Sequence, residues 1–63
     1  MKISERLDKI ADGLQAQRDE LRRLGIDLPY GRTLDEVECV YTHLRIDIES
    51  LRAMAAQLRK WNA

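Results

Sequence analysis

The segment that decides the fold is LGIDLPYGRTLDE, residues 24–36. Gly25 predicts the end of a first helix, because glycine adopts the left-handed conformation after a helix C-cap at little cost. Thr33 and Glu36 have the spacing of a capping box, in which Thr33 is the N-cap of a second helix. The segment therefore predicts a loop at 25–32 between two helices.

Apolar residues on both sides of this loop predict helices at about 3–24 and about 33–61. They recur in alternating steps of three and four residues, which is the pattern of a coiled-coil seam. The first seam contains Ile3, Leu7, Ile10, Leu14, Gln17, Leu21 and Leu24, and the second contains Leu34, Val37, Tyr41, Leu44, Ile48, Leu51, Ala55 and Leu58. Each helix is expected to pack through its seam.

The two seams predict that the helices pack antiparallel, as one hairpin domain spanning residues 1–63. If the chain folds back at the loop, paired residue numbers have a constant sum of 58, as for Leu14 with Leu44. The one polar seam residue, Gln17, then lies opposite Tyr41, and we expect it to hydrogen-bond the tyrosine hydroxyl. The predicted fold class is therefore all-α, an antiparallel two-helix hairpin.

A chain of 63 residues has little core of its own and commonly needs a disulfide, a metal or self-association. Cys39 is the only cysteine, so an internal disulfide is excluded. We expect two hairpins to form a homodimeric four-helix bundle. The expected dimer or partner interface combines a stripe beside the second seam, the last residue of that seam, and a glycine that allows close approach. Its residues are Val40, Met54, Leu58, Trp61 and Gly13.

The sequence offers little support for a metal site or for catalysis. Cys39 and His43 are four residues apart in the expected second helix. Zinc sites, however, usually draw ligands from two segments, and the helix expected at about 3–24 contains neither Cys nor His. Cys39 also lacks an enclosing pocket or a pair of oxyanion donors in a two-helix chain. We therefore expect no metal, no cofactor and no enzymatic activity.

A second candidate surface is formed by Arg45, Arg52 and Arg59, which recur every seven residues along helix 2. Such a line could contact an acidic protein partner or the phosphates of a nucleic acid. Eleven basic residues balance eleven acidic ones, and no aromatic residue is interleaved for base stacking. These features favour a protein partner over a nucleic acid.

Three further residues suggest a secondary contact. Cys39 and Ile46 lie on the back of helix 2, and Tyr30 lies in a loop that is apolar for a connector. For the loop, we favour an alternative in which Leu28 or Tyr30 covers the end of the core.

The remaining signals concern location and role. There is no secretory signal and no apolar run of about 20 residues, so we expect a cytoplasmic protein that does not enter a membrane. We expect a small regulator, adaptor or inhibitor that binds another protein as a homodimer. The alternative is an RNA- or DNA-binding regulator that uses the arginine line of helix 2.

Overall fold

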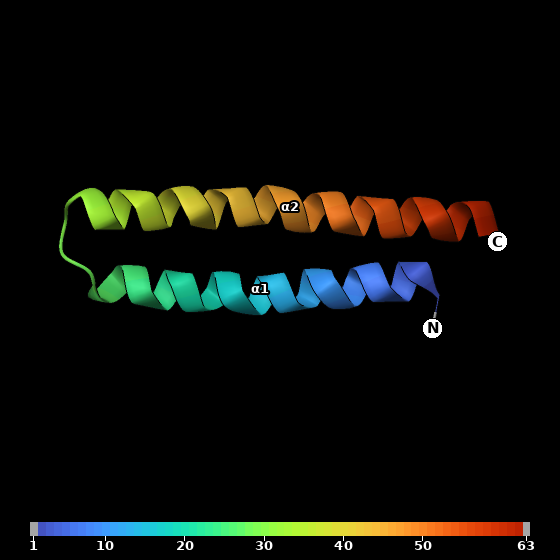
Figure 1. Cartoon of the computed structure of the whole chain (residues 1–63), viewed down its shortest axis with the longest axis horizontal. Coiled ribbons are helices and arrows are strands. Elements are labelled where there is room, and N and C mark those ends of the chain that lie inside the picture. The colour runs from blue at the N-terminus through green and yellow to red at the C-terminus, as the bar shows by residue number, and fades with distance from the viewer. Residues whose placement is uncertain (1, 63) are drawn as a thin grey trace.

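A computed structural model describes residues 2–62 as two antiparallel helices joined by a short loop (Figure 1). Helix α1 spans Ile3–Asp27 and helix α2 spans Arg32–Asn62. The helices lie side by side along their length, and the Cα trace measures 49 × 16 × 10 Å. The expectation of an all-α helical hairpin is confirmed.

The loop is shorter than the sequence suggested, because α1 continues through Gly25 to Asp27. Gly25 faces α2 instead of ending the helix, and a Cβ atom there would lie 3.7 Å from Leu34 Cδ1. The turn is made by Gly31, whose φ of +154° is a backbone conformation that other residues rarely adopt. The missing side chain of Gly25 therefore serves helix packing, and that of Gly31 serves the turn.

Helix α2 begins at Arg32, one residue before the expected N-cap, Thr33. The carbonyl oxygen of Gly31 accepts a hydrogen bond from the N–H of Asp35 at 3.1 Å, which forms the first turn. Glu36 accepts a hydrogen bond from Arg32 Nε at 3.0 Å. An ion pair within the first turn thus takes the place of the expected capping box.

Helix α2 packs through the seam that the sequence indicated, since each of its seam residues is buried or half-buried. Helix α1 is rotated relative to the expectation. Leu7, Leu14 and Leu21 face α2 as expected. In every other layer, however, the residue of α1 that faces α2 lies one position later than the expected seam residue. Those residues are Ser4, Ala11, Arg18 and Gly25.

Small side chains explain this rotation. Ala11 and Ala55 are fully buried and Ile48 is 2% exposed, so the core is built where one helix offers little bulk to the other. Helix separation depends on the side chains at the contact, and small residues allow the helices to approach closely. Turning the larger Ile3 and Ile10 inward would force the helices apart.

The contacts fix the register of the hairpin at a residue-number sum of 59. Gly25 lies against Leu34, and Arg18 lies against Tyr41. The same sum aligns the buried Ala11 with the buried Ile48. The observed register therefore differs by one residue from the expected sum of 58.

Arg18 occupies the layer that the sequence assigned to Gln17. Its Nε donates a hydrogen bond to the backbone carbonyl oxygen of Tyr41 at 3.1 Å. Its guanidinium carbon also lies 3.8 Å from the centroid of the Tyr41 ring, which is a cation–π arrangement. Gln17 is exposed, so the expected bond between Gln17 and the Tyr41 hydroxyl is corrected to a contact between Arg18 and the ring.

Candidate interaction surface

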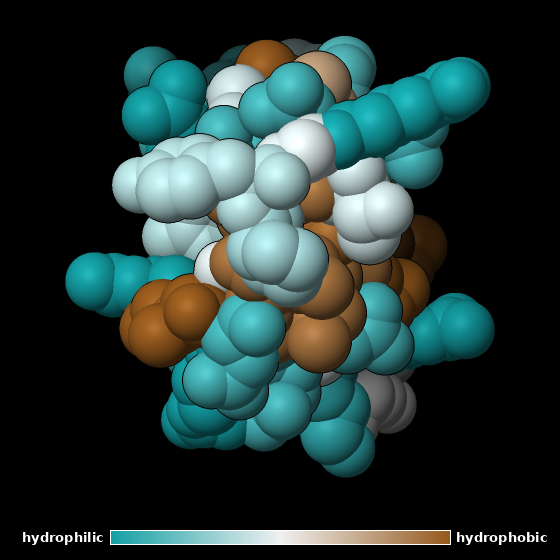
Figure 2. Space-filling view, turned by 90° about the vertical axis from the view of Figure 1, so that its left-hand side faces the viewer, coloured by the Kyte–Doolittle hydropathy of each residue, from teal (hydrophilic) through white to brown (hydrophobic). Residues whose placement is uncertain are grey.

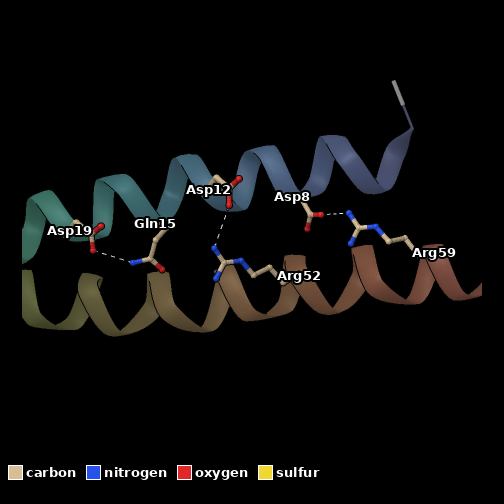
Figure 3. Close-up of polar contacts among 6 residues, drawn as sticks. All are labelled: Asp8, Asp12, Gln15, Asp19, Arg52 and Arg59. Carbon is tan, nitrogen blue, oxygen red and sulfur yellow. Dashed lines mark hydrogen bonds and ion pairs between the residues drawn. The ribbon is translucent and has the colours of Figure 1, made fainter.

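One long side of the hairpin, here called the charged side, carries ion pairs between the two helices (Figure 3). Arg59 pairs with Asp8, and Arg52 Nη2 lies 3.4 Å from Asp12 Oδ1. Both arginines are half-exposed, so these pairs orient the helices more than they stabilise them. Acidic residues of α1 thus lie beside Arg52 and Arg59 of α2.

The opposite long side follows from these pairs and from the helical repeat. Ser4 of α1 and Ala55 of α2 are buried where the helices face each other. Asp8 comes four residues after Ser4, Arg59 comes four residues after Ala55, and the two form an ion pair. On both helices, therefore, a residue four positions after such a buried residue lies on the charged side. Because an α-helix has 3.6 residues per turn, the residue just before each such buried residue lies on the other side of the interface between the helices. Ile10 and Met54 are such positions, and both therefore lie on the side opposite the ion pairs.

That opposite side is apolar. Each of its large hydrophobic residues is about half exposed or more, and Trp61 is 71% exposed. We call this surface the apolar side. It consists of Ile3, Ile10 and Leu24 from α1 with Val40, Met54 and Trp61 from α2.

The α2 half of the apolar side contains three of the expected interface residues, Val40, Met54 and Trp61. Leu58 is half-buried and continues the seam of α2 instead. Gly13 is exposed, and a Cβ atom there would meet no atom within 4 Å.

The α1 half, made by Ile3, Ile10 and Leu24, was missed because these residues were assigned to the seam. The sequence did contain a signal for the observed packing. Ser4, Ala11 and Gly25 recur every seven residues or a multiple of seven, and such small residues suit a closely packed helix interface better than large ones do.

The chain exposes more surface than a compact domain of its size. The accessible surface is 5126 Å², whereas a folded monomer of 7.4 kDa is expected to expose about 4,200 Å². The radius of gyration is 14.7 Å, against about 11 Å for a compact domain of this length. The excess of roughly 900 Å² follows from the elongated shape, in which each helix is covered by its neighbour on one face alone.

The arginine line is partly occupied by partners within the hairpin. Arg52 and Arg59 pair with aspartates, and Arg45 is exposed on the same side. A nucleic acid would have to compete with these aspartates and approach their negative charge.

The outer face of α2 carries the residues that suggested a metal or a secondary contact. Cys39 and His43 are exposed beside a shallow hollow, and Ile46 is 49% exposed. Within residues 2–62, no group of three His, Cys, Asp or Glu side chains is placed to hold a metal ion.

The loop end of the hairpin is hollowed, and hydrophobic surface is visible there between the two helices (Figure 2). Leu28 is half-buried and lines this hollow, whereas Tyr30 is 98% exposed at its rim. Of the two residues expected to cover the core end, only Leu28 does so. Tyr30 remains accessible.

Comparison with known proteins does not assign a family. No family model, curated protein or solved structure matches this chain. Neither described helix is long and apolar enough to cross a membrane. The interaction surface is therefore interpreted from its own geometry.

Proposed function

We propose that this chain is a non-enzymatic helical protein that forms a homodimeric four-helix bundle and acts by binding another protein. In this role it is a small regulator, adaptor or inhibitor. The observation that carries the proposal is the apolar side, on which both helices expose large hydrophobic residues along one face. Several large hydrophobic residues exposed on one face usually mark an interaction site.

A protein partner is favoured over a nucleic acid. The homodimer covers the apolar side, so a further partner binds elsewhere, where the exposed Ile46 and Tyr30 offer apolar contacts that the sugar-phosphate backbone does not match. The basic residues best placed for phosphate contact, Arg52 and Arg59, already pair with aspartates. We also propose a reducing, cytoplasmic setting, which suits the single exposed thiol of Cys39.

Analytical ultracentrifugation tests the self-association. The protein is expected to sediment as a dimer at micromolar concentration, and Met54→Glu is expected to sediment as a monomer, because a carboxylate would lie on the apolar side. Ile46→Glu is the matched control, since Ile46 and Met54 are 49% and 48% exposed on different faces of α2. A wild-type monomer at these concentrations would contradict the dimer.

The binding role requires a second measurement on the outer face. A dimer leaves Ile46 and Tyr30 exposed, so a protein that is captured by the wild type and lost with dimeric Ile46→Glu would support an adaptor. Binding to mixed nucleic acid that falls steeply with salt would instead favour the nucleic-acid alternative. The latter binding should disappear when Arg45, Arg52 and Arg59 are all replaced by alanine.

A further inference from the structure

The loop end of the hairpin has a less complete core than the other end. The buried residues of the described chain all lie in the half remote from the loop, and they are Ser4, Ala11, Ile48 and Ala55. Beside the loop, the apolar residues between the helices are only half-buried and surround a hollow of about 490 Å³. These residues are Leu21, Leu28, Leu34 and Val37. The volume is within the ~300–1,000 Å³ of pockets that bind ligands.

Two features of the chain produce this hollow. Gly25 lines it without a side chain, at a place where a Cβ atom would lie 3.7 Å from Leu34 Cδ1. Tyr30, the largest side chain of the loop, is 98% exposed at the rim and does not fold over the core. Since neither residue closes the end of the hairpin, the apolar floor of the hollow is open to an outside group.

The hollow opens on the charged side of the hairpin. Arg22 of α1 and Glu38 of α2 line it, and both are exposed. Arg22 comes two heptads after Asp8, and Glu38 comes three heptads before Arg59. Positions that differ by whole heptads share one side of a packed helix, and Asp8 and Arg59 form an ion pair of the charged side. A second copy docked on the apolar side would therefore leave the hollow open.

The rim of the hollow combines apolar side chains with one charge of each sign. Ile26 is 77% exposed at this rim, close to the accessible Tyr30. Among the described side chains, none of the ion pairs involves Arg22 or Glu38. An occupant that matches this rim therefore carries large apolar side chains with an acidic group and a basic group beside them.

We infer that the hollow binds an amphipathic helix of the partner protein, which inserts large apolar side chains between α1 and α2. This inference rests on the proposed protein-binding role and names its site. Amphipathic helices place their apolar face in hydrophobic grooves in this way. An acidic residue beside that face meets Arg22, and a basic residue on the other edge meets Glu38, so both rim charges gain charge-assisted hydrogen bonds.

The open shape of the hollow favours a helix over a free small molecule. Pockets for small molecules bury about 70–90% or more of the ligand surface. Around this hollow, however, Arg22, Ile26, Tyr30 and Glu38 are all exposed. A small molecule would keep one face in water, whereas a helix covers the open side with its own backbone and its flanking residues.

Two synthetic helical peptides test the site. Both carry leucines at positions i, i+3, i+4 and i+7 on one face. In one peptide both edges of that face carry glutamates, and in the other both edges carry lysines, so the direction in which the peptide binds does not affect the result. Fluorescence anisotropy of the labelled peptides gives their dissociation constants for the full-length protein. The wild type, with a rim of mixed charge, is expected to bind the two peptides about equally.

Charge substitutions at the rim should create a preference. Arg22→Glu is expected to favour the lysine peptide about tenfold or more, and Glu38→Lys the glutamate peptide to a similar degree. Lys9→Glu and Glu49→Lys are the matched controls, because they change the net charge equally at exposed positions in the other half of the hairpin. Rim variants that shift the ratio of the two constants no more than these controls do would overturn the site.

Ile26→Ser separates this site from the homodimer and from the proposed function. It should weaken both peptides about fivefold or more by removing an apolar contact, with the dimer mass unchanged. Ile46→Ser, on the outer face of α2, should bind both peptides as the wild type does. A monomeric Ile26→Ser would mean that a second copy occupies the hollow, which overturns the inference. A cellular protein captured by the wild type and by Ile26→Ser, but not by Ile46→Glu, would overturn this site and leave the protein-binding role intact.

Discussion

Replacing Tyr41 or Arg18 tests the central layer of the hairpin most directly. Arg18 contacts the ring of Tyr41 at 3.8 Å and donates to its backbone carbonyl oxygen at 3.1 Å. A cation–π contact contributes about 0.5–2 kcal/mol depending on exposure, and a hydrogen bond from a charged group about 1.5–3 kcal/mol. Both side chains are only half-buried, so we use the lower part of these ranges.

Arg18→Ala is therefore expected to lower the free energy of unfolding by about 2 kcal/mol, because it removes both contacts. Tyr41→Leu removes only the aromatic ring, since the carbonyl oxygen remains. Tyr41→Phe should change stability by less than about 0.5 kcal/mol, because the hydroxyl is not used and the ring is retained.

Urea unfolding of all variants at one fixed protein concentration compares these differences under the same conditions, because the apparent stability of a self-associating protein depends on its concentration. A double-mutant cycle of Arg18→Ala and Tyr41→Leu isolates the stacking term, expected at about 1 kcal/mol. Lysine at position 18 should not restore stability, because a compact ammonium cannot stack as a planar guanidinium does. A coupling energy of zero, or a Tyr41→Phe loss as large as that of Arg18→Ala, would refute the contact described here.

Three further substitutions test the packing and the turn. Ile48→Ala should cost about 2–5 kcal/mol in urea unfolding, because Ile48 is the largest buried core residue; unchanged stability would show that α2 packs through another face. Ala11→Leu should cost about 1–3 kcal/mol by forcing the helices apart, whereas Ala16→Leu, at an exposed position of α1, should be nearly neutral. Gly31→Ala should lower the melting temperature through a backbone penalty of about 1–3 kcal/mol, and an unaltered melting curve would argue against the positive φ at this turn.

The helices themselves could be predicted from the sequence, because hydrophobic periodicity is a local property of the chain. The spacing of Leu34 through Leu58 indicated the buried face of α2 correctly, and the short loop required antiparallel packing. The charges agreed, since Asp8 and Asp12 meet Arg59 and Arg52 in the folded chain. These features depend on residue order and helix geometry alone.

The rotation of α1 was decided by tertiary packing. Leu7, Leu14 and Leu21 belong to two possible seams, one completed by Ile3, Ile10, Gln17 and Leu24 and the other by Ser4, Ala11, Arg18 and Gly25. Hydrophobicity alone favours the first seam, but the fit of small residues against Ile48 and Ala55 and the stacking of Arg18 on Tyr41 select the second. Bulky residues left outside this interface then form the apolar side, which no single helix pattern could place.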